Sequence, residues 1–116
     1  MRQTSAALQK IRDDVKSLAV YDELLRRVKR IGEHEVEVKD TSIHIVHGRA
    51  FLGIHPRKDG LRLTIVLNRP LQNPRIKRSE QVSRNRYHHE IFIDTPEAID
   101  RELAVWIGEA YGLTAE

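Results

Sequence analysis

The hydrophobic period of this sequence changes from helical to extended at Gly32, and this change limits the fold more than any other feature. Before Gly32, apolar residues recur at spacings of three and four from Leu8 to Ile31, which is typical of one buried helical face. The pattern predicts a helix over residues 5–31, whole or interrupted. Gly32 is expected to end it in a left-handed conformation, which costs glycine least.

Alternation with a period of two begins after Gly32 and predicts strands. Residues 35–39 form one run, residues 42–55 read as a hairpin broken at Gly48, and residues 61–67 and 87–93 form two more strands. Residues 56–60 are a predicted tight turn, in which Pro56 presets φ and Gly60 takes a positive φ. Residues 68–86 sustain neither period, so the sequence predicts a long connection there.

A second helix is expected to start at Thr95-Pro96-Glu97, where threonine caps and proline needs no N–H, and to end near residue 111. One of its faces is apolar and consists of Ile99, Leu103, Trp106, Ile107 and Ala110. Together these elements predict an α+β fold with two layers: an antiparallel sheet of about five strands, covered on one face by N- and C-terminal helices.

Length and composition predict a single domain over residues 1–116, because one core suits a chain of this size. The absence of cysteine excludes disulfides, thiolate nucleophiles and thiolate metal sites. The charged N-terminal segment has no apolar region typical of a signal peptide, and no apolar run is long enough to span a bilayer. We therefore expect a cytoplasmic protein without a membrane partner.

Several segments together carry a family resemblance. They are the string FLGIHPRKDGLRL at 51–63, YHHEI at 87–91, TPE at 95–97, and the later Trp106 and Tyr111. The chain resembles the bacterial domain-of-unknown-function family 5655 over residues 18–112, which leaves residues 1–17 as an N-terminal helical extension. The resemblance implies a short α+β domain, of a kind found alone or joined to larger, sometimes nuclease-like proteins. It implies no catalytic residues.

Charge is distributed unevenly along the chain. Residues 49–89 hold ten Lys and Arg against two acids, a net +8, whereas residues 90–116 have a net charge of −6. Most of these bases are arginine, whose planar guanidinium suits phosphate. We therefore predict a non-catalytic module that binds nucleic acid or another phosphate-bearing ligand through an arginine-rich surface. The predicted ligand-binding residues are Arg57, Lys58, Arg62, Arg75, Lys77, Arg78, Arg84 and Arg86.

Two alternatives to this prediction stay open. In the first, the arginines bind no ligand: they keep a surface loop soluble and form ion pairs with acidic residues of the C-terminal helix. Alternatively, Arg57, Lys58 and Arg62 would hold one phosphate at the turn of residues 56–60, which otherwise is an ordinary hairpin turn. A site for single-stranded nucleic acid also needs stacking aromatics, and the basic stretch offers only Tyr87, because Phe51 is expected to be buried.

Histidines offer little evidence for a metal or cofactor, and none is predicted. His44 and His47 fall on opposite faces of a strand, and adjacent His88 and His89 diverge likewise. A site built across strands from His55, His89 and Glu90 remains open. No catalytic residue is predicted, because the chain has no nucleophile elbow, H-E-x-x-H helix or Walker motif; an uncharacterised enzyme ranks third.

A protein-interaction or structural accessory module is the second hypothesis. An exposed sheet edge accepts a strand from another protein, and residues 1–17 offer a helical surface for a homo-oligomer. Trp106 and Tyr111 have the helical spacing expected of core residues. The hypotheses separate on one question, which is whether the arginines of residues 57–86 converge on one surface.

Overall fold

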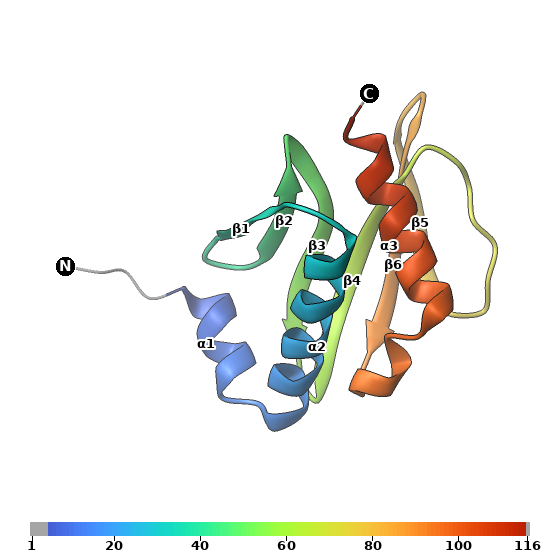
Figure 1. Cartoon of the computed structure of the whole chain (residues 1–116). Coiled ribbons are helices and arrows are strands. Elements are labelled where there is room, and N and C mark those ends of the chain that lie inside the picture. Colours follow the sequence, from blue (N-terminus) through green and yellow to red (C-terminus); the bar gives the residue numbers. More distant parts are fainter. Residues whose placement is uncertain (1–4, 116) are drawn as a thin grey trace.

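Helices pack against one face of a sheet in the computed structural model, which describes residues 5–115 (Figure 1). The helices are α1 (Ala6–Arg12), α2 (Val15–Ile31), the one-turn 3₁₀ helix η1 (Pro96–Ala98) and α3 (Arg101–Leu113). The strands are β1 (Glu35–Val38), β2 (Ile43–His47), β3 (Arg49–Arg57), β4 (Gly60–Leu67), β5 (Ile76–Ser83) and β6 (Arg86–Ile93). None of the helices within residues 5–115 is long and apolar enough to cross a membrane.

The predicted N-terminal helix is interrupted at Asp13 and Asp14, which separate α1 from α2. Asp14 is the N-cap of α2, and its Oδ1 accepts a hydrogen bond from the Ser17 N–H at 3.0 Å. Its Oδ2 accepts from the Asp59 N–H at 3.0 Å. These bonds hold the pKa of the Asp14 carboxyl below its usual value and tie the start of α2 to the β3–β4 turn.

Gly32 ends α2 as expected, but in an extended conformation (φ 165°) rather than the predicted left-handed one. Glycine is needed there for space, because an added Cβ would lie 2.6 Å from Cζ of Tyr111. The Tyr111 hydroxyl donates to the Glu33 carbonyl oxygen at 2.9 Å. The C-terminal helix therefore packs directly against the end of α2.

The sheet has six antiparallel strands in the order β1-β2-β3-β4-β6-β5, one more than predicted. The prediction of a connection over residues 68–86 was wrong in its second part, since this segment contains all of β5 and the first residue of β6. Residues 68–75 form a loop, and residues 84–85 form the turn between β5 and β6. β5 has no hydrophobic alternation because it is an edge strand, exposed along almost its whole length.

Two local predictions need correction, one about the turn of residues 56–60 and one about the start of the C-terminal helix. Asp59, with φ 62°, is the left-handed residue of the β3–β4 turn, whereas Gly60 already belongs to β4. Thr95 and Pro96 start only η1; α3 begins six residues after Thr95 and is capped by Asp100, whose Oδ1 accepts from the Leu103 N–H at 3.0 Å. Asp100 takes the N-cap position instead of Thr95 because its carboxylate interacts with both the N-terminus of α3 and the Arg75 guanidinium.

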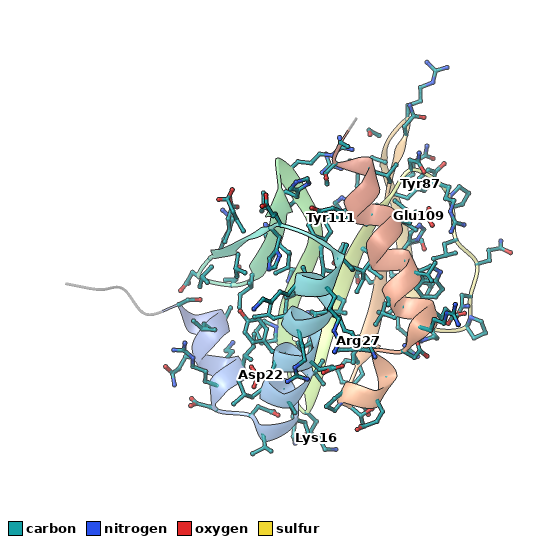
Figure 2. All side chains as sticks on the ribbon, in the orientation of Figure 1. Lys16, Asp22, Arg27, Tyr87, Glu109 and Tyr111 are labelled. Atoms are coloured by element: carbon teal, nitrogen blue, oxygen red, sulfur yellow. The ribbon has the colours of Figure 1, made fainter. Side chains whose placement is uncertain are left out.

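The core lies between the sheet and the pair α2 and α3. The predicted apolar face of α3 is buried, as are alternate residues of the central strands such as Leu63 and Ile65. Asp22 is exposed and Arg27 is half-buried, and Figure 2 shows them on opposite sides of α2, with Arg27 on the side nearer α3. Since alternate residues of a strand point to opposite faces, the remaining residues of β2–β6 form a second, polar surface, here called the open face.

Candidate anion-binding site on the open face of the sheet

Strand pairing brings polar residues of the open face into rows across the sheet. In one row, Gly53 on β3 is paired with Thr64 on β4, which is paired with Glu90 on β6. Its neighbour joins His55, Arg62 and Phe92 across the same three strands. On the other side of the Gly53 row, Val66, His88 and Glu80 form a third row over β4, β6 and β5.

These rows surround a concave pocket of about 370 Å³, a volume within the range of ligand sites. Gly53 lies in the central row, where the absence of a side chain deepens the surface. A Cβ added to Gly53 would be in ordinary contact with Thr64 (3.5 Å) and His55 (3.6 Å). The polar side chains that line the pocket are His44, His55, Arg62, Thr64, Glu80, Arg86, His88 and Glu90.

Guanidinium groups on this face lack close partners. Glu90 lies between Arg62 and Arg78, with closest nitrogen–oxygen distances of 3.8 Å and 3.9 Å, both too long for hydrogen bonds. The Nε atoms of Arg62 and Arg86 are buried, and neither has a hydrogen-bond acceptor among the described residues. These two Nε atoms are closed off from solvent, so a phosphate would meet the outer guanidinium nitrogens; the side chain of Arg62 is 33% exposed.

Two histidines of the open face, His55 and His88, resist protonation. Burial lowers the pKa of His55 below its usual value of 6.5, and the nearby Arg62 and Arg57 lower it further. The pKa of His88 is lowered first by burial and then by Arg86. Neutral imidazoles supply one donor and one acceptor each without repelling the arginines.

The structure brings three of the eight sequence-predicted residues together on the open face, namely Arg62, Arg78 and Arg86. Arg57 and Lys58 lie instead at the β3–β4 turn, in a hollow that they share with Lys10, Asp13 and Asp14 of the α1–α2 junction. Lys77 lies at a register irregularity of β5, and Arg84 is in the turn between β5 and β6. The predicted residues therefore do not form one continuous surface.

Arg75 is engaged by other parts of the chain. Its guanidinium donates to Asp100 at 2.9 Å, Glu102 at 3.3 Å and the Ala98 carbonyl oxygen at 2.6 Å, and lies 5.9 Å from the centre of the Trp106 ring. Arg69 similarly makes two hydrogen bonds to Glu109, at 2.7 and 2.9 Å. Arg75 and Arg69 therefore pair with acidic residues of the C-terminal helix, as the alternative interpretation of the sequence expected.

The metal site that the sequence left open is not assembled as imagined. His89 faces the helices and is fully buried, whereas His55 and Glu90 lie on the open face, where His88 is their neighbour. Within residues 5–115, no three His, Asp or Glu side chains are grouped as metal ligands.

Sequence reasoning also missed several residues of the open face. They are His44, Gly53, Thr64, His88 and Phe92. The signal was available in the alternation of β4: once Leu61, Leu63 and Leu67 are assigned to the core, Arg62 and Thr64 must face the other way.

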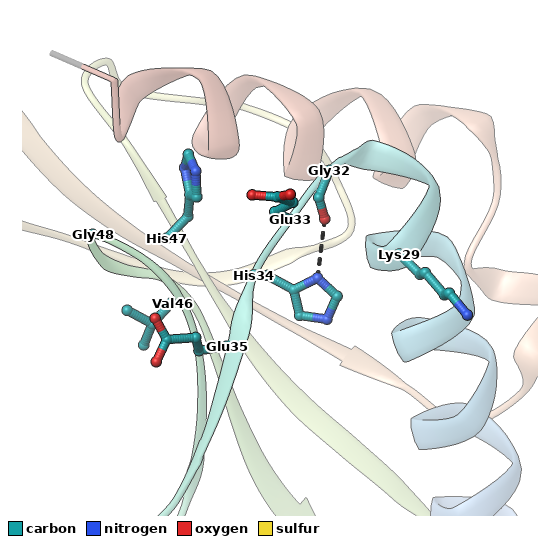
Figure 3. Close-up of a pocket in the computed structure, with 8 residues that line it drawn as sticks. All are labelled: Lys29, Gly32, Glu33, His34, Glu35, Val46, His47 and Gly48. Atoms are coloured by element: carbon teal, nitrogen blue, oxygen red, sulfur yellow. Dashed lines mark hydrogen bonds between the residues drawn. The ribbon is translucent and has the colours of Figure 1, made fainter.

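A second, wider hollow of about 680 Å³ lies where α2, β1 and the β2–β3 turn meet (Figure 3). Both of its histidines already have other roles. His34 Nδ1 donates to the Gly32 carbonyl oxygen at 3.0 Å, and His47 stacks on Tyr111 with ring centres 4.5 Å apart. Figure 3 shows Lys29 turned away from His34. This hollow has no convergent donor set, so the open face is the stronger candidate.

Comparison with known proteins finds no matching curated protein and no matching solved structure. A family model described as "Domain of unknown function (DUF5655)" matches residues 6–114. The match includes α1, which the resemblance noted in the sequence left outside, and it ends after α3. Because this match takes in nearly the whole chain, the protein belongs to the DUF5655 family.

Proposed function

We propose that the open face binds single-stranded nucleic acid without catalysing a reaction, and that the protein does so in the cytoplasm. Phosphates would lie against Arg62, Arg78 and Arg86, and one base would stack on Phe92. The observation that carries the proposal is that Arg62 and Arg86 line the same pocket, where the contact of Arg62 with Glu90, at 3.8 Å, is longer than a hydrogen bond.

The charge of the open face supports an anionic ligand. Around β4, β5 and β6 it carries three arginines against Glu80 and Glu90, a net +1 with neutral histidines. Glu90 is shared by two guanidinium groups at distances longer than hydrogen bonds, so both arginines retain donors for a phosphate. Opposing acids remain close enough to make the binding moderate rather than tight.

Phe92 supplies an aromatic ring on the open face, whereas Tyr87 of the basic stretch lies on the opposite face of β6. The Phe92 side chain is 40% exposed, and it is paired across the strands with Arg62. A base stacked on an exposed ring, with its phosphate on an adjacent arginine, is the arrangement by which proteins bind single strands without strong sequence preference. The rings of His55 and His88 extend the same surface.

Fluorescence polarisation with labelled oligothymidylate and oligouridylate tests the proposal. We expect Arg62→Ala and Arg86→Ala each to weaken binding about fivefold, since each removes one phosphate contact worth about 1 kcal/mol. Phe92→Ala is expected to weaken it about tenfold through lost stacking. Arg101→Ala, which removes an exposed charge from α3 in the other layer, is the matched control and should change little.

Competition identifies the source of the phosphate. The labelled oligonucleotide is mixed with an unlabelled mononucleotide at the same concentration of nucleotides. If the mononucleotide displaces it, the ligand is a small phosphate compound that fits the pocket. If Arg101→Ala weakens binding as much as Arg62→Ala, attraction is nonspecific and the open face is not the site.

A further inference from the structure

β1 offers an unpaired strand edge that the open-face site does not explain. It forms one side of the sheet and, within residues 5–115, pairs only with β2. All four of its residues are exposed, and Val36 and Val38, which share the helix-covered face with Ile45 and Ile43, are 38% and 45% exposed. An edge strand with exposed valines is a template for another strand.

The free hydrogen-bonding groups of this edge belong to the two valines. Lys39 donates its N–H to the Ser42 carbonyl oxygen at 2.9 Å, toward β2. In an antiparallel pair the inward and outward groups alternate along the strand, so Glu37 and Glu35 also point inward. The N–H and C=O groups of Val36 and Val38 therefore point away from the sheet.

The opposite edge of the sheet is less suited to pairing. β5 has two register irregularities against β6, between Ile76 and Arg78 and between Gln81 and Ser83, and Lys77 lies within the first. Bulges and lysine on an edge strand are the usual means of blocking a further strand. β1, in contrast, pairs with β2 in an unbroken register from Glu35 to Val38.

We propose that β1 pairs antiparallel with β1 of a second copy of this chain, which makes one continuous sheet across the dimer. The two-fold axis passes at Glu37, because this register pairs the outward groups of Val36 with those of Val38 in the other copy. The same register places Glu35 opposite Lys39 of the other copy, twice.

The register is self-complementary in charge and in hydrophobicity. Four valines, two from each copy, meet on the helix-covered side, and the Glu35–Lys39 pairs meet on the open face. The two Glu37 side chains oppose each other at the axis, but each has Lys39 of its own copy at 3.7 Å. No other antiparallel register uses the whole strand and pairs both acids and bases in this way.

Such a short strand predicts a weak dimer that forms as the concentration rises. Sedimentation velocity over a wide concentration range measures it directly on the full chain. We expect a monomer–dimer equilibrium for the unsubstituted chain. Val38→Pro removes an outward N–H but no bond to β2, so it should abolish the dimer. Val105→Ala, which trims an exposed valine on α3, is the control and should leave the equilibrium unchanged.

Charge reversal tests the register itself and does not depend on a proline being tolerated. Lys39→Glu turns both cross-copy pairs into repulsions, and we expect the dissociation constant to rise about tenfold or more. Adding Glu35→Lys to Lys39→Glu restores opposite charges and should restore the dimer. A monomer at every concentration, or a dimer that ignores Lys39→Glu, overturns the proposal; failure of the double variant to recover overturns the register. The outcome is independent of nucleic-acid binding, which Arg62→Ala tests separately.

Discussion

His89 joins three segments of the chain through one buried ring. Its Nε2 donates to the Arg69 carbonyl oxygen at 2.9 Å, which leaves Nδ1 as the acceptor for the Ser79 hydroxyl at 2.7 Å. The carbonyl fixes this tautomer, since it accepts only. The ring thereby attaches the loop of residues 68–75 and strand β5 to the centre of β6.

We predict that His89→Leu lowers the free energy of unfolding by about 2 kcal/mol, because it leaves the Arg69 carbonyl and the Ser79 hydroxyl without partners in a buried place. Urea denaturation followed by circular dichroism measures the change. His88→Leu is the matched control on the neighbouring, partly exposed position and should cost less. Equal effects would show that the two hydrogen bonds of His89 contribute nothing specific.

The lowered pKa values of His55 and His88 predict how stability depends on pH. Below 6.5 the unfolded chain takes up protons that the folded chain resists, so the unfolded state is favoured as the pH falls. We expect the free energy of unfolding to be highest above pH 6.5 and to decrease from there to about pH 5. The double variant His55→Gln/His88→Gln should lose this slope.

Carboxyl groups change the stability of the protein in a separate, more acidic pH range. Hydrogen bonds lower the pKa values of Asp14 and Asp100 below 3.8, so the stability they contribute is present above 3.8 and is lost as the pH falls through the lower folded values. Denaturation curves at several pH values separate the two ranges. If the free energy of unfolding of the double variant still decreases between pH 6.5 and 5, groups other than His55 and His88 cause that decrease.

At the residue scale, the sequence predicted that His88 and His89 diverge but not which of them faces the core. Both faces of β6 carry rings, because Tyr87 and His89 lie on one side and His88 and Phe92 on the other. Partners distant in sequence, the Arg69 carbonyl and Ser79, decide the matter by satisfying both ring nitrogens of His89. Alternation in a single strand contains no such information.

At the scale of elements, the predictable strands were those with one buried face. β4 alternates because one side packs on α2 and α3. β5 was missed because its residues, exposed on both sides, show no period, and its pairing with β6 depends on backbone hydrogen bonds that any residue but proline makes. The sequence prediction allowed for an interruption of the first helix without placing it; the break falls at Asp13 and Asp14 because aspartate favours caps over helix interiors.

Two glycines on neighbouring strands provide a prediction at this scale. A Cβ on Gly60 would lie 2.5 Å from the Ile93 carbonyl oxygen and 2.6 Å from Phe92, whereas a Cβ on Gly53 makes only ordinary contacts. We expect Gly60→Ala to lower the free energy of unfolding by about 2 kcal/mol through overpacking. Gly53→Ala should leave it nearly unchanged. Thermal or urea denaturation compares them, and equal stability of the two variants would contradict the close approach at Gly60.

The whole molecule divides its arginines among several surfaces, which the charge count of the sequence could not show. Neighbouring positions such as Lys77 and Arg78 separate by strand alternation and bulges, and Arg75 is neutralised by acids more than twenty residues later in the chain. A net charge of +8 over residues 49–89 therefore becomes three arginines on the open face. The number of charges is a property of the sequence, but their grouping is a property of the fold.

This grouping predicts the salt dependence of nucleic-acid binding. Three phosphate contacts to a single strand give a slope of about −2 in a plot of log affinity against log salt concentration, whereas all eight sequence-predicted residues would give about −6. Polarisation titrations at several salt concentrations measure the slope, and Arg62→Ala should make it shallower by about 0.7. A slope near −6 would place the contacts beyond the open face.

The strand order has a further consequence for how the length of this chain can vary. β4 and β5 are both antiparallel to β6, so they run parallel, and residues 68–75 must return along β6 before β5 begins (Figure 1). β4 ends at Leu67, opposite Tyr87, and β5 begins at Ile76, opposite Ile91, so the connection has to advance only about 13 Å along β6 and about 10 Å across two strand spacings. Eight fully extended residues reach about 28 Å, so this segment has slack, and it bows outward in Figure 1. A deletion of one or two residues should therefore still let β5 reach β6.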